Sequence, residues 1–254
     1  VGAGSIAREF SLRYLIPANG VEVNGIVDVN LDAARSLAED VGYHRAGAVI
    51  IGAKYRETVD RNSITKSNDE IPQVFYSTNL SELLPLVDCI YVATPPSTHA
   101  DLVAQVLSAQ KQIILEKPLA VSLNDCDRIV NLSQEALGNG LFVGVNIGMR
   151  YNAALHEMKR LIDHPDFGQI ENASLRLLFR QWPREWQRQP WVSQRQEGGP
   201  LLEVGTHWVF GILELFGHNH YHSTHSGVIE YPDGADGILC ESRCSGMIEF
   251  QNDS

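Results

Sequence analysis

The sequence is poor in the features that mark secreted and membrane-spanning proteins. It has four cysteines among 254 residues, too few and too scattered for a disulfide scaffold. No apolar run approaches the ~18 residues needed to cross a bilayer, and no charged-then-apolar signal peptide opens the chain. We therefore expect a cytoplasmic protein without a membrane partner.

Positive charge is also scarce. The chain has 20 lysine and arginine residues against 31 aspartate and glutamate residues, which gives a formal net charge of −11 at pH 7. A protein that binds the phosphate backbone of a nucleic acid needs a basic face to displace counterions. The charge balance therefore argues against a nucleic-acid partner.

What the sequence does contain is enough apolar material, 44% of its residues, for a sizeable core. In its first part, short apolar segments alternate with segments whose apolar residues recur every three or four positions. This alternation predicts a parallel α/β sheet. The expected strands are 21–28, 88–93, 112–115 and 141–145. The expected helices are 5–16, 31–41, 98–108 and 123–137.

The alternation breaks between residues 44 and 73, in a stretch that holds glycines and a polar run. A connection this long is uncommon inside a compact domain, so we read it as an insertion and assign it no chemistry. Farther along the chain we expect helices at 153–162 and 201–216, and strands at 169–180, 220–231 and 238–250. Strands that follow one another without helices between them predict a second, antiparallel α+β domain.

A glycine-rich turn, Gly2-Ala3-Gly4-Ser5-Ile6-Ala7, opens the chain and matches the G-x-G-x-x-G/A pattern. The first glycine permits a tight turn, and the second lets the backbone approach a pyrophosphate at the start of a helix. Asp28 follows the next predicted strand, where a carboxylate would bind the ribose hydroxyls of the adenosine. No arginine adjoins Asp28 to bind a 2′-phosphate, so we expect NAD rather than NADP. The expected cofactor contacts here are Gly2, Gly4, Ser5, Ile6 and Asp28.

Three further segments follow in order: Ala93-Thr94-Pro95-Pro96-Ser97-Thr98-His99, Glu116-Lys117-Pro118, and Gly198-Gly199-Pro200-Leu201-Leu202-Glu203-Val204-Gly205-Thr206-His207-Trp208. Together with the glycine turn, they resemble the Gfo/Idh/MocA oxidoreductases, the family of glucose–fructose oxidoreductase and inositol dehydrogenase. The resemblance runs from Val1 to about residue 217, and more loosely to the end.

The resemblance implies an α/β Rossmann domain over residues 1–147, followed by an α+β domain with a large, mostly antiparallel sheet over residues 148–254. It also implies a longer chain, so we expect the second domain to be incomplete at its carboxyl end. Oligomerisation through the open face of the large sheet is implied as well, giving a homodimer or a homotetramer.

The resemblance also implies site residues. In the family the nicotinamide lies at the junction of the two domains, and the residues of the first domain that match its motifs are Thr94, Pro95, Pro96, His99, Glu116 and Lys117. Lys117 would be catalytic, and the Lys117–Pro118 bond is expected to be cis. The family's D-x-G-x-H motif is matched by residues 203–207. Glu203 and His207, four residues apart on a helix, would share one face.

These side chains suit the oxidation of a hydroxyl group, in which a base takes the hydroxyl proton while a hydride leaves carbon. His207 suits the base because the reference pKa of histidine is near 6.5. Lys117 would hydrogen-bond the same oxygen, and Glu203 would orient a substrate hydroxyl or His207. We therefore expect an NAD-dependent dehydrogenase or reductase that acts on a CH–OH group of a sugar, cyclitol or sugar derivative.

A second function stays open because Glu203 and Phe210 stand where relatives more often carry aspartate. Some members of the family bind NAD(P) as regulators or sensors without turnover. The presence of both Lys117 and His207 favours the enzyme.

Two segments of the second domain are candidate substrate contacts. Residues 146–152 resemble the family's N-x-R-[FY]-[DN] segment, which suggests roles for Arg150, Tyr151 and Asn152. Residues 180–191 interleave tryptophans with arginines. This stretch either binds a sugar through Trp182 or packs against the first domain or a partner subunit, since tryptophan faces bind sugars and arginine binds anions.

No metal is expected. Four histidines lie close together, at positions 218, 220, 222 and 225, but no acidic or cysteine partner accompanies them at the spacing of a metal site.

Overall fold

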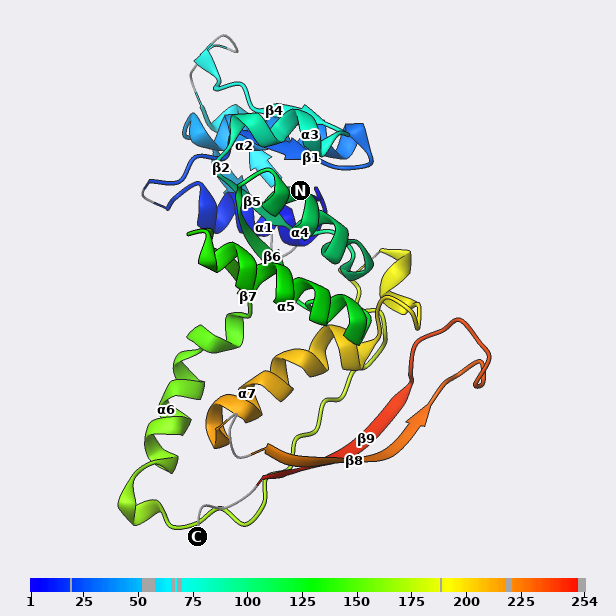
Figure 1. Cartoon of the computed structure of the whole chain (residues 1–254). Coiled ribbons are helices and arrows are strands. Elements are labelled where there is room, and N and C mark those ends of the chain that lie inside the picture. Colours follow the sequence, from blue (N-terminus) through cyan, green and yellow to red (C-terminus); the bar gives the residue numbers. More distant parts are fainter. Residues whose placement is uncertain are drawn as a thin grey trace. The chain divides into compact units, whose positions relative to one another are not determined.

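The computed structural model describes residues 1–18, 20–51, 58–64, 67, 70–187, 189–217 and 221–250. The chain divides into two compact units, Val1–Val145 and Asn146–Ser254 (Figure 1). No helix among the described residues is both long and apolar enough to span a bilayer.

The first unit contains two pieces of sheet. In one, β1 pairs with β4 in parallel, and in the other β5 pairs with β6 in parallel and β7 lies beyond β6. Their bounds are Gly25–Val27 for β1, Phe75–Ser77 for β4, Cys89–Val92 for β5, Gln112–Glu116 for β6 and Val143–Asn146 for β7.

The first two residues join these two pieces. Gly2 N donates to the Val27 carbonyl of β1 at 2.7 Å, and the Val1 carbonyl accepts from Ala93 N, just after β5, at 2.8 Å. The resulting order is β4, β1, Val1, β5, β6, β7. It is the strand order of the doubly wound dinucleotide-binding sheet.

Helices pack on this sheet in two separate apolar clusters, so both of its faces are covered. One cluster contains residues of α1 and α2, and the other contains residues of α3, α4 and α5. Leu12, Leu37, Val92, Ile113 and Leu115 are fully buried in them. The bounds are Ser5–Phe10 for α1, Leu31–Arg45 for α2, Leu80–Leu83 for α3, His99–Ser108 for α4 and Leu123–Gly138 for α5. The helix of α1 continues as a π-helical segment, Ser11–Leu15.

The insertion predicted at 44–73 starts at the end of α2 and forms an antiparallel hairpin of β2 (Val49–Ile51) and β3 (Thr58–Asp60). A buried carboxylate, Asp40 of α2, connects this hairpin to the first helix. Asp40 pairs with Arg8 of α1 and, at 3.0 Å, with Arg61, directly after β3. One acid thus binds the insertion to the helix that follows the glycine turn.

Where the structure describes it, the second unit contains helices and one strand hairpin. Its main helices are α6 (Ala153–Ile162) and α7 (Thr206–Phe216), and its hairpin pairs β8 (Tyr221–Glu230) with β9 (Arg243–Phe250) in antiparallel fashion. The strand predicted at 169–180 is wrong: residues 169–179 form no strand. A strand needs a neighbour for its backbone hydrogen bonds, and this segment pairs with none of the strands that the structure describes.

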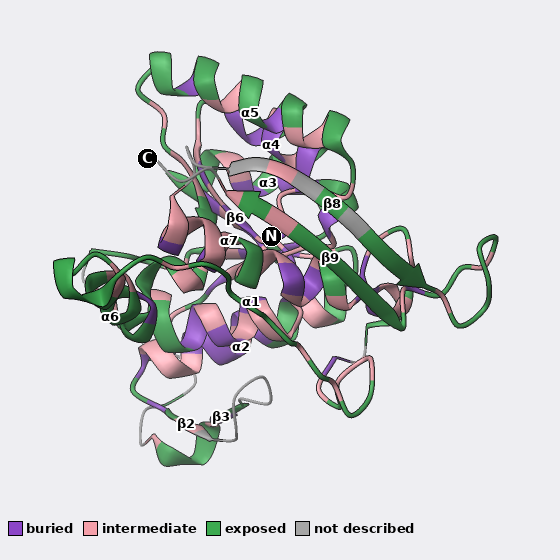
Figure 2. Cartoon of the chain, turned by 90° about the horizontal axis from the view of Figure 1, so that it is seen from below, coloured by how far each residue is buried: buried purple, intermediate pink, exposed green. Residues whose placement is uncertain are grey.

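The large antiparallel sheet expected for the second domain is not seen among the described residues, where the sheet has two strands. Most of β9 is exposed, as Figure 2 shows, and Met247 is 60% exposed. The hairpin contacts α7 through the rings of Phe250 and Phe216, whose centroids lie 5.4 Å apart.

Substitution of Asp40 tests its role as the link to the insertion. Asp40→Ala leaves Arg8 and Arg61 without their shared carboxylate, so we expect the free energy of unfolding to fall by about 1–3 kcal/mol. The control is Asp101→Ala, which removes an exposed ion pair with Arg128 and should cost less than about 1 kcal/mol. Urea denaturation measures both, and equal losses would show that Asp40 is no more than a surface charge.

Candidate cofactor and active site

The glycine turn at residues 2–4 packs tightly on one side and is open on the other. Gly2 has φ +90°, and a Cβ at this position would lie 2.7 Å from the Ala93 carbonyl oxygen. A Cβ on Gly4, the residue before α1, would meet no atom within 4 Å. The fold therefore requires the first glycine, whereas the space at Gly4 fits the close approach of a pyrophosphate.

Asp28, just after β1, lies beside this turn. Its Oδ2 accepts from Ala3 N at 2.7 Å, and its Oδ1 accepts from Asn30 N at 2.8 Å. Each carboxylate oxygen can accept a second hydrogen bond, so both remain able to bind ribose hydroxyls. The turn and the carboxylate that the sequence assigned to the dinucleotide are therefore in direct contact.

The residues Gly2 and Gly4 provide a matched test of this cofactor site. Gly4→Ala should leave the melting temperature unchanged and weaken NAD binding by about tenfold or more, because the methyl group enters the open space. Gly2→Ala should instead lower the free energy of unfolding by about 1–3 kcal/mol through strain and collision with Ala93. Circular dichroism and titration calorimetry measure the two effects. Unchanged NAD affinity in Gly4→Ala would mean that the cofactor does not approach this turn.

The segment 94–99 follows β5 and lies beside the glycine turn. A Cβ on Gly2 would also lie 3.2 Å from Thr94 N, so this segment adjoins the glycine turn. The Thr94 and Thr98 hydroxyls are 2.7 Å apart, and Pro96 begins a short 3₁₀ turn that leads into α4. His99, the first residue of α4, is completely buried.

The His99 ring connects this segment to the loop that follows Glu116-Lys117-Pro118. Its Nε2 lies 3.1 Å from the Thr94 carbonyl oxygen, and its Nδ1 lies 3.1 Å from the Leu119 carbonyl oxygen. These two contacts hold the two loops together. Because the side chain is not exposed, His99 would act on a bound cofactor only through these loops. Burial lowers the pKa of His99 below its ordinary value of 6.5.

Glu116 ends β6 and Lys117 follows it directly, and the expected cis bond between Lys117 and Pro118 is confirmed. Glu116 is buried, and its carboxylate accepts from the Tyr91 hydroxyl at 2.5 Å and from Lys117 N at 3.3 Å. Tyr91 in turn stacks on Phe10 of α1, with ring centroids 4.4 Å apart. The sequence motif identified Glu116 but not Tyr91, because nothing local marks an aromatic residue on a neighbouring strand as its partner.

The buried His99 gives the protein a predictable response to acid. Because the pKa is lower in the folded state, the unfolded chain binds more protons between pH 6.5 and that lower value. The contribution of neutral His99 to stability is therefore complete above about pH 6.5. It is lost as the pH falls from 6.5 toward the lower pKa of the folded state. We expect His99→Gln to lose less stability than the parent between pH 7.5 and 5.5. Denaturation curves at each pH measure the difference, and parallel losses would contradict it.

In the second unit, the glycine pair 198–199 allows close packing before the long helix. A Cβ on Gly198 would lie 2.5 Å from the Val192 carbonyl oxygen, and Gly199 has φ +103°. The helix that follows begins with a π-helical segment, Leu201–Gly205, where the sequence predicted an ordinary α-helix from residue 201. Leu201 N donates to the Glu241 carboxylate at 2.6 Å, so the start of this helix is fixed from another segment.

Glu203 and His207 lie on this continuous helix, Glu203 in its π-helical part and His207 in the first turn of α7. Glu203 is 6% exposed, and His207 is half-buried. The π-helical segment forms i→i+5 hydrogen bonds, so the angle between side chains four residues apart differs there from the angle in an α-helix.

The candidate substrate residues of the second unit have varied surroundings. Asn152 caps α6, its side chain accepting from Ala154 N at 2.9 Å, while Arg150 and Tyr151 are exposed. The 3₁₀ turn that contains Arg150 and Tyr151 packs against α7. The Trp182 indole N–H donates to the Val192 carbonyl at 3.1 Å, which commits its polar group within the unit.

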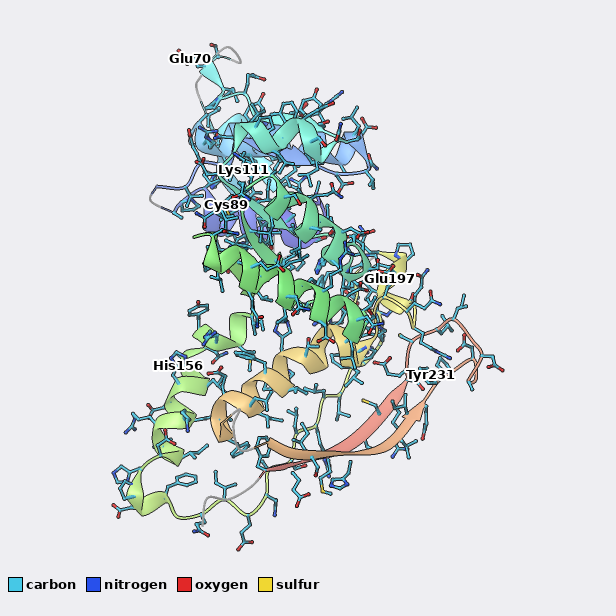
Figure 3. All side chains as sticks on the ribbon, viewed as in Figure 1. Glu70, Cys89, Lys111, His156, Glu197 and Tyr231 are labelled. Atoms are coloured by element: carbon cyan, nitrogen blue, oxygen red, sulfur yellow. The ribbon has the colours of Figure 1, made fainter. Side chains whose placement is uncertain are left out.

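Arg195 fixes the connection between β8 and β9. Its guanidinium lies 3.6 Å from the ring centroid of Tyr231, a residue marked in Figure 3, and it also pairs with Asp233 at 3.2 Å. The backbone N–H groups of Leu239 and Ile238 donate hydrogen bonds to the Asp233 carboxylate, and these bonds lower the pKa of Asp233. These contacts order a connection that contains no regular strand.

The described residues hold no group of three or more histidine, cysteine or acidic side chains that could bind a metal ion. Of the clustered histidines, positions 218 and 220 lie outside the described residues. His225, which is described, lies 3.2 Å from the Glu249 carboxylate on the neighbouring strand.

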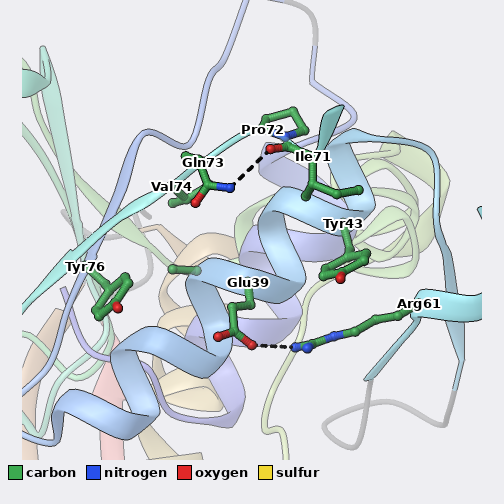
Figure 4. A pocket seen from close by; sticks show the side chains of 9 residues that line it. Glu39, Tyr43, Arg61, Ile71, Pro72, Gln73, Val74 and Tyr76 are labelled. Carbon is green, nitrogen blue, oxygen red and sulfur yellow. Dashed lines mark hydrogen bonds and ion pairs between the residues drawn. The ribbon is translucent and has the colours of Figure 1, made fainter. Parts of the chain in front are cut away.

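A cavity of about 360 Å³ lies in the first unit, between α2 and the segment that leads into β4 (Figure 4). It is lined by Ala38, Glu39, Tyr43, Arg61, Ile71, Pro72, Gln73, Val74 and Tyr76. The guanidinium of Arg61 lies over the Tyr43 ring and pairs with Glu39 at 3.1 Å. Residues 71–74 of the lining precede β4, so the cavity lies toward the amino end of that strand. The glycine turn and Asp28 lie instead at the carboxyl ends of the parallel strands.

Comparison with known proteins matches residues 1–145, more than half of the chain, to the family described as "Oxidoreductase family, NAD-binding Rossmann fold". The predicted NAD-binding Rossmann domain is thereby confirmed. The chain is 31% identical to inositol 2-dehydrogenase 3 of Saccharopolyspora erythraea over 170 residues, 66% of this chain and 40% of that protein. It is 26% identical to D-xylose dehydrogenase of Paenarthrobacter nicotinovorans over 197 residues, 73% of this chain and 47% of that one. The chain thus spans less than half of each relative.

Solved structures share the fold. The WlbA dehydrogenase from Bordetella pertussis, in complex with NADH and UDP-GlcNAcA, matches 98% of this chain and 62% of its own, with a TM-score of 0.71 and 19% identity. An oxidoreductase from Thermotoga maritima matches 98% of this chain and 67% of its own, with a TM-score of 0.69 and 16% identity.

Proposed function

The chain belongs to the Gfo/Idh/MocA family of oxidoreductases, and on that premise we propose that it acts on sugar-like alcohols with NAD. The reaction would interconvert a CH–OH group of a sugar, cyclitol or sugar derivative and the corresponding carbonyl. NAD, when bound, supplies the acceptor for the hydride that leaves carbon.

One observation carries this proposal: the dinucleotide motifs converge at the carboxyl ends of the parallel strands. Asp28 accepts from the glycine turn at 2.7 Å, Gly2 approaches Ala93, and His99 bridges the loops after β5 and β6. Ligands of doubly wound sheets bind at this edge. Lys117, at the end of β6, belongs to the same set of loops.

In the proposed reaction, His207 takes the hydroxyl proton as general base, and the Lys117 ammonium group hydrogen-bonds the oxygen that becomes the carbonyl. Glu203 orients a substrate hydroxyl or His207. These roles follow the family motifs matched at each position, and the half-buried state of Lys117 and His207 leaves both able to reach a ligand.

The proposed substrate class follows from the relatives, which include inositol and D-xylose dehydrogenases. Arg150 and Tyr151, exposed on a turn packed against α7, are the proposed substrate contacts in the second unit. We also propose that β8 and β9 belong to a larger antiparallel sheet, through which a homodimer or homotetramer would form.

Turnover with NAD and a panel of polyols and sugars tests the proposal, followed by absorbance at 340 nm. We expect activity with NAD to exceed activity with NADP, and we expect Lys117→Ala and His207→Ala each to lower turnover by at least ~100-fold. The control is Lys111→Ala, a substitution elsewhere in the first unit. Tight NAD binding without reduction of NAD by any substrate would instead favour a regulator or sensor.

A further inference from the structure

Three residues from the tryptophan- and arginine-rich segment 180–191, Trp182, Arg184 and Trp186, contact one another within the second unit. The Arg184 guanidinium lies over the rings of both Trp182 and Trp186, 5.5 and 4.5 Å from their centroids. Trp182 is itself fixed by the hydrogen bond from its indole N–H to Val192. Cation–π contacts of this kind restrict where the guanidinium lies.

A side-chain amide connects these three residues to Glu203. Gln187 and Glu203 are both buried, at 7% and 6% exposure. Arg184 Nε donates to Gln187 Oε1 at 2.8 Å, and Gln187 Nε2 donates to Glu203 Oε2 at 3.4 Å. A guanidinium only donates and an ionised carboxylate only accepts, so a single orientation of the amide satisfies both neighbours.

We propose that Gln187 is a positioning residue for the Glu203 carboxylate, and that Arg184, held by Trp182 and Trp186, sets the orientation of Gln187. This inference rests on the proposed function, in which Glu203 orients the substrate or His207. A glutamate side chain has several rotatable bonds, and small displacements of a reacting group are costly. The donated hydrogen bond restricts the carboxylate within its buried site.

The same contacts assign a role to the segment whose purpose the sequence left open. Arg184, Trp182 and Trp186 contact one another within the second unit, and Gln187 connects Arg184 to Glu203. The charged groups along this chain of contacts are Arg184 and Glu203, and Glu241 binds the start of the same helix at Leu201 N. The amide is the neutral link between the cation and the anion.

The test replaces the donor with an acceptor of the same size. Gln187→Glu places a second carboxylate against Glu203, and Gln187→Met removes the hydrogen bond without adding a charge. We expect kcat/KM to fall by about tenfold or more in Gln187→Glu, with its acidic limb moved to higher pH, and less in Gln187→Met. The Kd for NAD should not change. Gln189→Glu and Gln189→Met, at an exposed position of the same segment, should match the parent.

A second readout needs no turnover. The ¹³C carboxyl resonance of Glu203, assigned by its absence in Glu203→Gln, should change its chemical shift at neutral pH in both Gln187→Met and Gln187→Glu, because each substitution removes the hydrogen bond donated to the carboxylate. A resonance at the parent position in both variants would overturn the inference, whatever the activity. If Gln187→Glu does not fold, the uncharged Gln187→Met variant decides the question alone. Failure of every substrate would count against the proposed function and leave the position of this resonance to judge the role of Gln187.

Discussion

The first unit depends on the contact between the glycine turn and the end of β5. Val1 and Gly2 supply the hydrogen bonds that join β1 and β4 to β5, β6 and β7. The backbone at Gly2 comes so close to Ala93 that a side chain would collide with it. The same close approach aligns the turn with Asp28 and with the start of the 94–99 segment, so the cofactor site and the continuity of the sheet share one origin.

Buried polar groups then hold the loops around that site. The His99 ring lies between the Thr94 and Leu119 carbonyls, and the Tyr91 hydroxyl donates to buried Glu116. In the second unit, Gln187 does the same for Glu203. A buried polar group without a hydrogen-bond partner destabilises the folded state. Each of these hydrogen bonds therefore favours one position of the loop that carries its partner. In both units, residues from one segment thus orient the candidate reactive groups of another.

Much of the first unit was predictable because its signals are local. Apolar periodicity located α2, α4 and α5 to within a few residues, and the glycine turn with Asp28 indicated an NAD-binding Rossmann domain. The failures concern structure that depends on distant partners. The segment 169–180 has the composition of a strand but no neighbour to pair with, and the helix expected from residue 201 begins with π-helical winding. Neither outcome is encoded in a short window of sequence.

The sequence by itself determined the chemical groups available to this protein: a glycine turn, the Asp28 carboxylate, and the lysine, histidine and glutamate of the family motifs. Residue type and spacing suffice to identify these motifs, because each motif is a short stretch of the sequence. Only the tertiary structure decided which partners hold them, such as Tyr91 for Glu116 and Gln187 for Glu203. It also revealed Asp40 as the link between the insertion and the first helix. These pairings join residues far apart in sequence, and burial makes their hydrogen bonds count because no water replaces a missing partner.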